Sequence, residues 1–90
     1  MPIKVHIPTP MRPHTDGQAV VEAAGATVQA TLDNLSQKFP ALQAKLFEKG
    51  RVRQYVNLYL NDEDIRYLDN LDTPVKDGDE LSIIPAVAGG

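Results

Sequence analysis

The alternation of apolar and polar residues predicts two short strands at the start of the chain. Residues 3–7 alternate strictly, which is typical of a strand with one buried face. Prolines at positions 8, 10 and 13 interrupt this pattern, and Asp16-Gly17 indicates a turn. Residues 19–24 form a second strand-like stretch, which ends at Gly25. We expect the two stretches to pair as a hairpin.

A helical period follows Thr27. Apolar residues recur there at intervals of three or four, which places them on one helical face: Val28, Leu32, Leu35 and Phe39. Thr27 is a favourable N-cap, and Pro40 ends the helix. Residues 41–47 predict a further short helical segment, which Gly50 terminates.

The second half of the chain predicts three further strands. Residues 52–60 give the clearest one. Its aliphatic face alternates with an amphipathic face: Val56, Leu58 and Leu60 against Tyr55, Asn57 and Tyr59. Asn61-Asp62 indicates a turn, after which we expect residues 65–68 to pair back. Asp77-Gly78 indicates another turn, before a last strand at residues 80–84.

The order of these elements predicts an α+β fold. Strands on both sides of one main helix indicate a mixed sheet that curls over that helix as a roll. A length of 90 residues suffices for one domain with a modest core. We therefore expect a single folded domain at residues 1–84, in which the helix face packs on the strands.

The last residues, 85–90, predict an arm and not a strand. Pro85 lacks a backbone N–H and has a fixed φ, so it is unfavourable inside a central strand. At about 3.3 Å per residue, the arm extends to roughly 20 Å. Its diglycine end can pass through a channel too narrow for a Cβ. The pattern indicates a flexible tail that delivers its carboxylate to another protein's active site; an incidental frayed terminus is the alternative.

Composition narrows the classes of function. The formal net charge of −3 is unfavourable for binding nucleic acid, which requires a basic face. Because the sequence has no cysteine, it has no disulfide framework, thiolate nucleophile or zinc finger, and any sulfur must come from an external donor. No segment has the pattern of a membrane span or a signal peptide. We expect a cytoplasmic protein that binds neither membrane nor nucleic acid.

Conventional catalytic groupings are missing from the sequence. His6 and His14 are the only histidines and have no cysteine to pair with, so we expect exposed side chains and no metal site. The acidic residues 62–64 follow a turn and lack the periodic ligands of a calcium loop, which favours a solvated turn. Three arginines are expected to form salt bridges, with contact to a partner as the alternative: Arg51, Arg53 and Arg66.

Side-chain parity in the last strand predicts a docking surface. If Leu81 and Ile83 are directed into the core, Ile84 is directed outward at the root of the tail. In a sheet that places the two strands side by side, Ile84 lies near Tyr55 and Tyr59. An apolar and aromatic patch of this kind is suited to contact with a partner protein.

The sequence also resembles the ubiquitin-like sulfur carriers of the ThiS/MoaD family. Residues 77–90, which run from Asp77-Gly78 to the terminal diglycine, resemble the C-terminal signature of that family. Residues 7–10, 12–13 and especially 56–66 resemble its CysO-type branch, whose carriers serve cysteine synthesis. The resemblance covers nearly the whole chain and implies the β-grasp fold, the ubiquitin-like form of the predicted roll.

The resemblance implies a carrier and not an enzyme, with no cofactor of its own. An ATP-dependent activating enzyme (an adenylyltransferase) would adenylate Gly90, and a sulfur donor would convert it to a thiocarboxylate. Gly89 and Ala88 would give the tail access to that enzyme. In the CysO-type branch the acceptor enzyme is a pyridoxal-phosphate-dependent cysteine synthase, and a metalloprotease later frees the cysteine.

Other functions remain open at this point. The MoaD and ThiS branches share the tail but supply sulfur for molybdopterin and thiamin synthesis. A ubiquitin-like modifier joins the same terminal glycine to lysines of other proteins. A noncovalent β-grasp interaction domain uses no tail chemistry at all.

Overall fold

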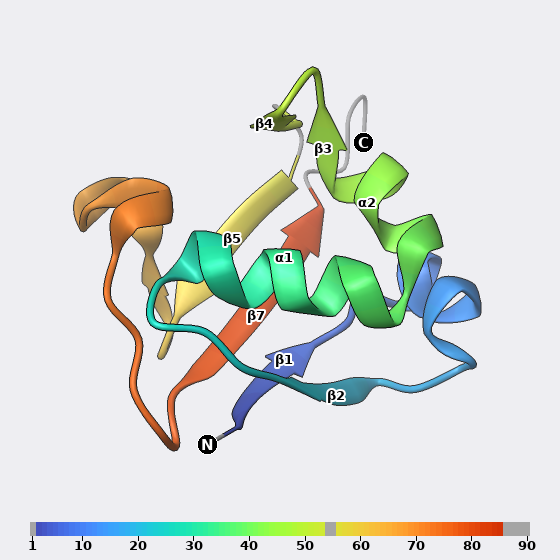
Figure 1. The fold of residues 1–90 in the computed structure, drawn as a ribbon, viewed down its shortest axis with the longest axis horizontal. Helices are drawn as coiled ribbons and strands as arrows, with labels where there is room; N and C mark the ends of the chain where they lie inside the picture. Colours follow the sequence, from blue (N-terminus) through green and yellow to red (C-terminus); the bar gives the residue numbers. More distant parts are fainter. Residues whose placement is uncertain (1, 54–55, 86–90) are drawn as a thin grey trace.

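The computed structural model describes residues 2–53 and 56–85, which form a mixed sheet curled around one main helix (Figure 1). The five-stranded sheet has the order β2-β1-β7-β5-β6, in which β1 and β7 are parallel and the other neighbours are antiparallel. This architecture confirms the predicted α+β roll. The elements are β1 (Ile3–His6), the 3₁₀ helix η1 (Thr9–Thr15), β2 (Val20–Ala23), α1 (Val28–Lys38), α2 (Pro40–Leu46), β3 (Phe47–Glu48), β4 (Arg51–Val52), β5 (Val56–Leu60), β6 (Glu63–Asp64), the 3₁₀ helices η2 (Ile65–Tyr67) and η3 (Asn70–Asp72), and β7 (Glu80–Pro85).

The core fills the space between the sheet and α1. The predicted helix face is confirmed, because Val28, Leu32 and Leu35 are fully buried and Phe39 is partly buried against the core. The strands contribute the inward-facing residues that the alternation predicted: Ile3, Val5, Ile7, Val56, Leu58, Leu81 and Ile83. β2 adds Val21 and Ala23, so one continuous apolar cluster joins α1 to four of the five strands of the sheet.

α1 begins where the sequence predicts. The Thr27 side chain accepts a hydrogen bond from the backbone N–H of Ala30 at 3.1 Å, which caps the first turn. A Cβ on Gly25 would lie 2.5 Å from the backbone nitrogen of Thr31, so glycine is required by the close passage of the chain over this turn. None of the helices in the described part of the chain has the length and apolarity needed to cross a membrane.

The predicted strand at residues 52–60 is in fact two elements. The chain first forms a separate hairpin of β3 and β4, whose turn holds Lys49 and Gly50 at φ values of 54° and 78°. Such positive values are typical of tight two-residue hairpin turns. β5 begins only at Val56, and Tyr55 lies outside the described residues.

The strand that pairs back onto β5 is β6, and the prediction of residues 65–68 is wrong. Asn61 and Asp62 have φ values of 51° and 70°, so they form a two-residue turn that pairs Leu60 directly with Glu63. Asp64 then accepts the backbone N–H of Arg66 at 2.9 Å and caps η2. The chain is therefore already helical where the second strand was expected.

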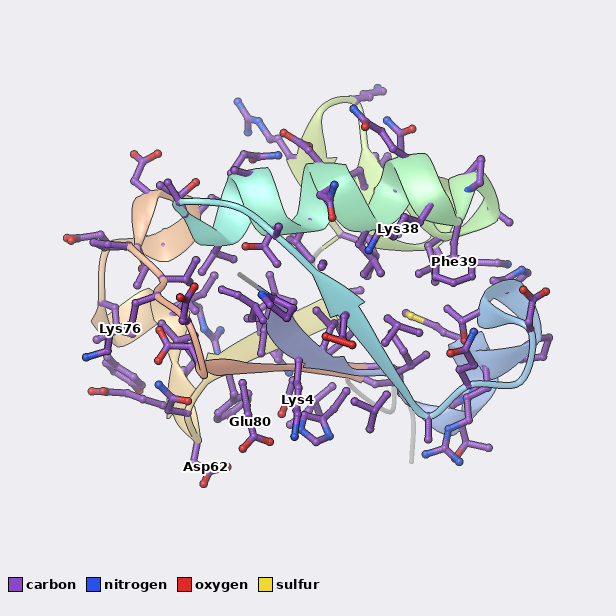
Figure 2. The ribbon with its side chains drawn as sticks, turned by 60° about the horizontal axis from the view of Figure 1, so that its bottom comes forward. Lys4, Lys38, Phe39, Asp62, Lys76 and Glu80 are labelled. Carbon is purple, nitrogen blue, oxygen red and sulfur yellow. The ribbon has the colours of Figure 1, made fainter. Side chains whose placement is uncertain are left out.

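Side chains of α1 cover part of the outer edge of β2. The Lys38 amine, which lies beside β2 in Figure 2, donates a hydrogen bond to the carbonyl of Glu22 at 2.8 Å. The side-chain oxygen of Asn34 accepts the backbone N–H of Ala24 at 3.0 Å. Two main-chain groups on the side of β2 that has no neighbouring strand are thereby satisfied.

A polar link joins the β5–β6 turn to the start of β7. The Asn61 amide donates to Asp79 Oδ1 at 3.0 Å, and its oxygen accepts the backbone N–H of Glu80 at 2.9 Å. Asp79 is buried and also accepts the backbone N–H of Lys76 at 2.9 Å. The hydrogen bond from Asn61, together with the one from Lys76, lowers the pKa of Asp79 below its usual value.

Truncation of the helix face tests this core. Leu32 is fully buried, so Leu32→Ala leaves a cavity and should lower the free energy of unfolding by about 2–5 kcal/mol. Urea denaturation measures this change. Gln29→Ala, on the same helix but outside the core, should have a much smaller effect. Equal losses in the two variants would contradict the assignment of the buried face.

Neutralising Asp79 should change how stability depends on pH. The folded pKa of Asp79 is lowered, so its ionised form stabilises the fold at pH values above about 3.9, the unfolded value. That contribution is lost as the pH falls through the lower, folded pKa. Asp79→Asn should therefore be less stable than the wild type at pH 7, and the difference should shrink below pH 4. Urea denaturation at both pH values measures it, and a constant difference would contradict the assignment.

Candidate functional site at the root of the tail

The end of β7 presents its even-numbered residues on the outer face of the sheet. Leu81 and Ile83 are buried under α1, whereas Ser82 is half-buried and Ile84 is 45% exposed. The predicted outward direction of Ile84 is thus observed. An exposed isoleucine on the central strand, next to the tail, is the starting point of the candidate site.

β5 adds an aromatic side chain to this face. Ile84 pairs across the strands with Asn57, and Ser82 pairs with Tyr59. Ile84 and Tyr59 are therefore diagonal neighbours, a spacing of roughly 7–8 Å that large side chains can bridge. The structure brings these two predicted docking residues together, while the third, Tyr55, lies outside the described residues.

Pro85 belongs to β7, although the sequence predicts that it leaves the sheet. It pairs with Val56 of β5. The bond from Lys4 N–H to the Asp79 carbonyl, 3.2 Å, indicates that odd-numbered residues of β7 direct their main-chain groups toward β1. β1 pairs with β7 only as far as Ser82, so the missing N–H of Pro85 leaves no sheet bond unmade. The predicted tail residues Ala88, Gly89 and Gly90 lie outside the described residues.

A hollow of about 360 Å³ lies beside Pro85, between η1 and the end of β7. Pro8 and Arg12 line one side of it, and Ile84 and Pro85 line the other. The sequence predicted only a proline-rich loop here. Its prolines instead occur before, at the start of and inside a 3₁₀ helix. The position of Arg12 at the hollow was not predicted, since it depends on how η1 folds against β7.

The two histidines lie on different elements, His6 on β1 and His14 on η1. His6 Nε2 lies 2.6 Å from Glu80 Oε1 on the exposed outer face, where Figure 2 shows Glu80 directed away from α1. His14, which was expected to be exposed, is half-buried on η1. Within residues 2–53 and 56–85, no three histidine, aspartate or glutamate side chains gather closely enough to hold a metal ion.

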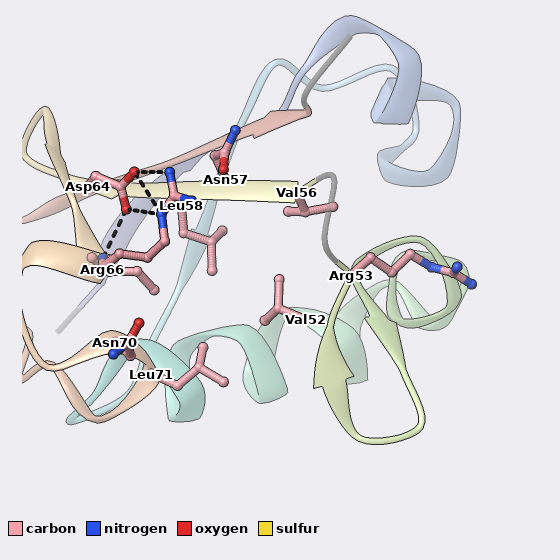
Figure 3. Close-up of a pocket in the computed structure, with 10 residues that line it drawn as sticks. Val52, Arg53, Val56, Asn57, Leu58, Asp64, Arg66, Asn70 and Leu71 are labelled. Carbon is pink, nitrogen blue, oxygen red and sulfur yellow. Dashed lines mark hydrogen bonds and ion pairs between the residues drawn. The ribbon is translucent and has the colours of Figure 1, made fainter. Parts of the chain in front are cut away.

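A second hollow, of about 500 Å³, lies beside β5 and is lined by apolar residues such as Val56, Leu58 and Leu71 and by as many polar ones (Figure 3). At its rim Arg66 donates to both carboxylate oxygens of Asp64, at 2.7–3.2 Å. These hydrogen bonds lower the pKa of Asp64. The acidic run is therefore a solvated turn only at residues 62 and 63, because Asp64 is buried in a bonded pair.

The predicted salt bridges are found for two of the three arginines. Arg66 pairs with Asp64, and Arg53 Nη1 lies 3.1 Å from Glu48 Oε1. Arg51 is exposed on β4. Both pairs hold neighbouring elements together, and the carboxylate of Asp64 in particular is fully engaged by its arginine. We therefore take the outer face near Ile84, and not the hollow beside β5, as the candidate functional surface.

Known proteins of similar sequence and structure extend over the whole chain. The ThiS family model matches residues 5–90. The chain is 42% identical to the sulfur carrier protein CysO of Mycobacterium tuberculosis, and the match covers all of both proteins. It is 38% identical to small archaeal modifier protein 3 of Haloferax volcanii, over 72% of this chain and 71% of that protein.

Among solved structures, the crystal structure of the BexX/CysO complex of Amycolatopsis orientalis contains a similar chain. The two chains are 44% identical and superimpose with a TM-score of 0.91, over 98% of this chain and 99% of that one. The fold predicted from the strand order and the resemblance of the tail are thus both confirmed. The chain belongs to the ThiS family.

Proposed function

We propose that this protein is a sulfur carrier whose terminal Gly90 is adenylated and then converted to a thiocarboxylate. The observation that carries the proposal is the exposed Ile84 at the end of the central strand, directly before a family-matched segment that ends in two glycines. A partner enzyme that docks on this face receives the tail. The full-length match to a protein named as a sulfur carrier supports the same function.

The chemistry of the tail explains why an activating enzyme is needed. A terminal carboxyl group has a pKa near 3.5 and is ionised at pH 7, and an anion is a poor acyl electrophile. Reaction with ATP forms an acyl adenylate and releases pyrophosphate. A sulfur donor then attacks the acyl carbon, AMP leaves, and the terminal –COO⁻ has become –COS⁻. The carrier supplies only the carboxylate, so the catalytic groups belong to its partners and the chain itself is not an enzyme.

The similarity to CysO favours cysteine biosynthesis in the cytoplasm as the destination of the sulfur. The thiocarboxylate would attack an activated amino acid on a pyridoxal-phosphate-dependent cysteine synthase, and a metalloprotease would then release the cysteine from the carrier. Delivery to molybdopterin or thiamin synthesis is the alternative among sulfur carriers. Mixing the thiocarboxylate form with the cognate synthase and following cysteine formation distinguishes these destinations.

Covalent modification of other proteins is the second candidate function, and the similarity to a small archaeal modifier protein favours it. An adenylated Gly90 can also be attacked by the deprotonated amine of a lysine, which forms an amide and releases AMP. Intact-mass analysis after incubation with the activating enzyme, ATP and a sulfide source separates the two functions. A mass gain equal to one sulfur in place of one oxygen supports the carrier, and ladders of conjugates support the modifier.

Deletion of Gly90 is the direct test of the tail. It withdraws the carboxylate by about 3.3 Å, more than the ~1 Å that can already cost a hundredfold in rate. We expect loss of ATP–pyrophosphate exchange with the activating enzyme and an unchanged melting temperature. Gly89→Val keeps the length but adds a branched side chain, and should fail in the same way. Normal exchange by the Gly90 deletion would refute the proposed function.

Substitution of Ile84 tests the docking face. Ile84→Asp places a charge where an apolar contact is expected, so it should weaken binding to the activating enzyme about tenfold or more while the fold persists. Tyr67→Asp is the matched control, since Tyr67 is also apolar and 82% exposed but lies on η2, outside this face. Titration calorimetry measures both affinities. Equal affinities for the wild type and Ile84→Asp would remove Ile84 from the interface.

A further inference from the structure

We propose that Arg12 positions the carrier on its activating enzyme by binding a carboxylate of that enzyme at the root of the tail. The inference rests on the proposed function and assigns a specific partner group to one side of the docking face. It follows from the hydrogen bonds of Arg12, from the hollow that it borders and from the length of the tail.

The Arg12 side chain is held in place before any partner arrives. Its Nε donates to the carbonyl of Ile7 at 3.1 Å, and the side chain is half-buried. Its own carbonyl accepts the hydroxyl of the buried Thr15 at 3.1 Å and the N–H of Gly17 at 2.8 Å. Backbone and side chain are thus both anchored, which reduces the entropy lost when the guanidinium binds a ligand.

The outer nitrogens of this guanidinium have no partner among the described residues. Only Nε forms a hydrogen bond there, whereas Arg66 gives both Nε and Nη2 to the carboxylate of Asp64. Glu80, the acid at the start of β7, is paired with His6 at 2.6 Å. The guanidinium of Arg12 therefore presents free N–H groups beside the hollow, in the geometry that binds a carboxylate through two parallel hydrogen bonds.

The surroundings of Arg12 define what can occupy the hollow. Ile84 and Pro85 line the same hollow, so an occupant with one acidic group and an adjoining apolar surface is complementary to it. Such an occupant covers Ile84 and pairs with Arg12 at the same time. The hollow is continuous with the proposed docking face, because Ile84 belongs to both.

The length of the tail argues that this acidic group belongs to the enzyme and not to the nucleotide. From Pro85 to Gly90 an extended chain spans about 17 Å at 3.3 Å per residue. The phosphate that reacts with Gly90 is therefore bound at the far end of the tail, while the protein surface of the enzyme lies against the root. An aspartate or glutamate of that surface is the ligand that fits.

Steady-state ATP–pyrophosphate exchange tests this role with the full-length carrier as the varied substrate. Arg12→Ala should raise KM for the carrier about tenfold or more and leave kcat nearly unchanged, because the interaction forms on docking and persists through the reaction. Arg12→Lys keeps the charge but loses the planar guanidinium, so its KM should lie between those of the wild type and Arg12→Ala. Lys76→Ala removes a positive charge from the loop before β7, at the other end of that strand, and should behave as the wild type.

Salt dependence provides a readout that a merely structural role would not change. The KM of the wild type should rise with ionic strength, and that of Arg12→Ala should rise much less. Melting curves of both variants identify any that is not folded. Arg12→Lys is the more conservative substitution, so it still tests the inference if Arg12→Ala does not fold. An unchanged KM for folded Arg12→Ala, or a loss in kcat alone, would overturn the inference. Failure of this inference is distinct from failure of the proposed function, because the wild type would still support ATP–pyrophosphate exchange if Arg12 had no role.

Discussion

The burial of β7 between β1 and β5 is the constraint on which the rest of this structure depends. Leu81 and Ile83 are fixed under α1, so the alternation of the strand forces Ser82 and Ile84 to the outer face. The same strand leads directly into the tail. The residues that follow Pro85 in the sequence are thereby attached to the central strand of the sheet, next to the residues that the proposed partner would recognise.

This arrangement separates recognition from chemistry. Under the proposed function, a partner binds the outer face near Ile84 while the chemistry takes place at Gly90, and the core residues Leu81 and Ile83 lie on the other side of β7. Two polar pairs fit this division, since the ion pair Asp64–Arg66 and the hydrogen-bonded pair Asn61–Asp79 hold turns in place. Such a separation suits the proposed function, in which an activating enzyme and an acceptor enzyme would act on the same terminus in succession.

Much of the fold could be predicted from the sequence because local pattern and tertiary burial agree. The 3.6-residue period of α1 and the alternation in β1, β5 and β7 survive unchanged in the structure. The predictions that failed have local causes. The strand expected at residues 65–68 was misplaced because Asn61 and Asp62 adopt left-handed conformations, which make the turn only two residues long. The β3–β4 hairpin was missed because Lys49-Gly50 is the only turn pattern that marks it in the sequence. The alternation of inward and outward side chains along the strands correctly predicted that Ile84 and Tyr59 lie on the outer face. The position of Arg12 could not be predicted, because it follows from the packing of η1 beside β7, and no periodic pattern in the sequence indicates that packing.

The hydrogen bonds from α1 to the outer edge of β2 affect how copies of the protein meet one another. An exposed edge strand has unpaired main-chain groups that can bind the edge strand of another molecule, and repeated additions of this kind lead to fibres. The carbonyl of Glu22 and the N–H of Ala24 are already bonded, so a second copy must displace Lys38 and Asn34 before it can add there. The helix that fills the core thus also hinders strand addition at the β2 edge of the sheet.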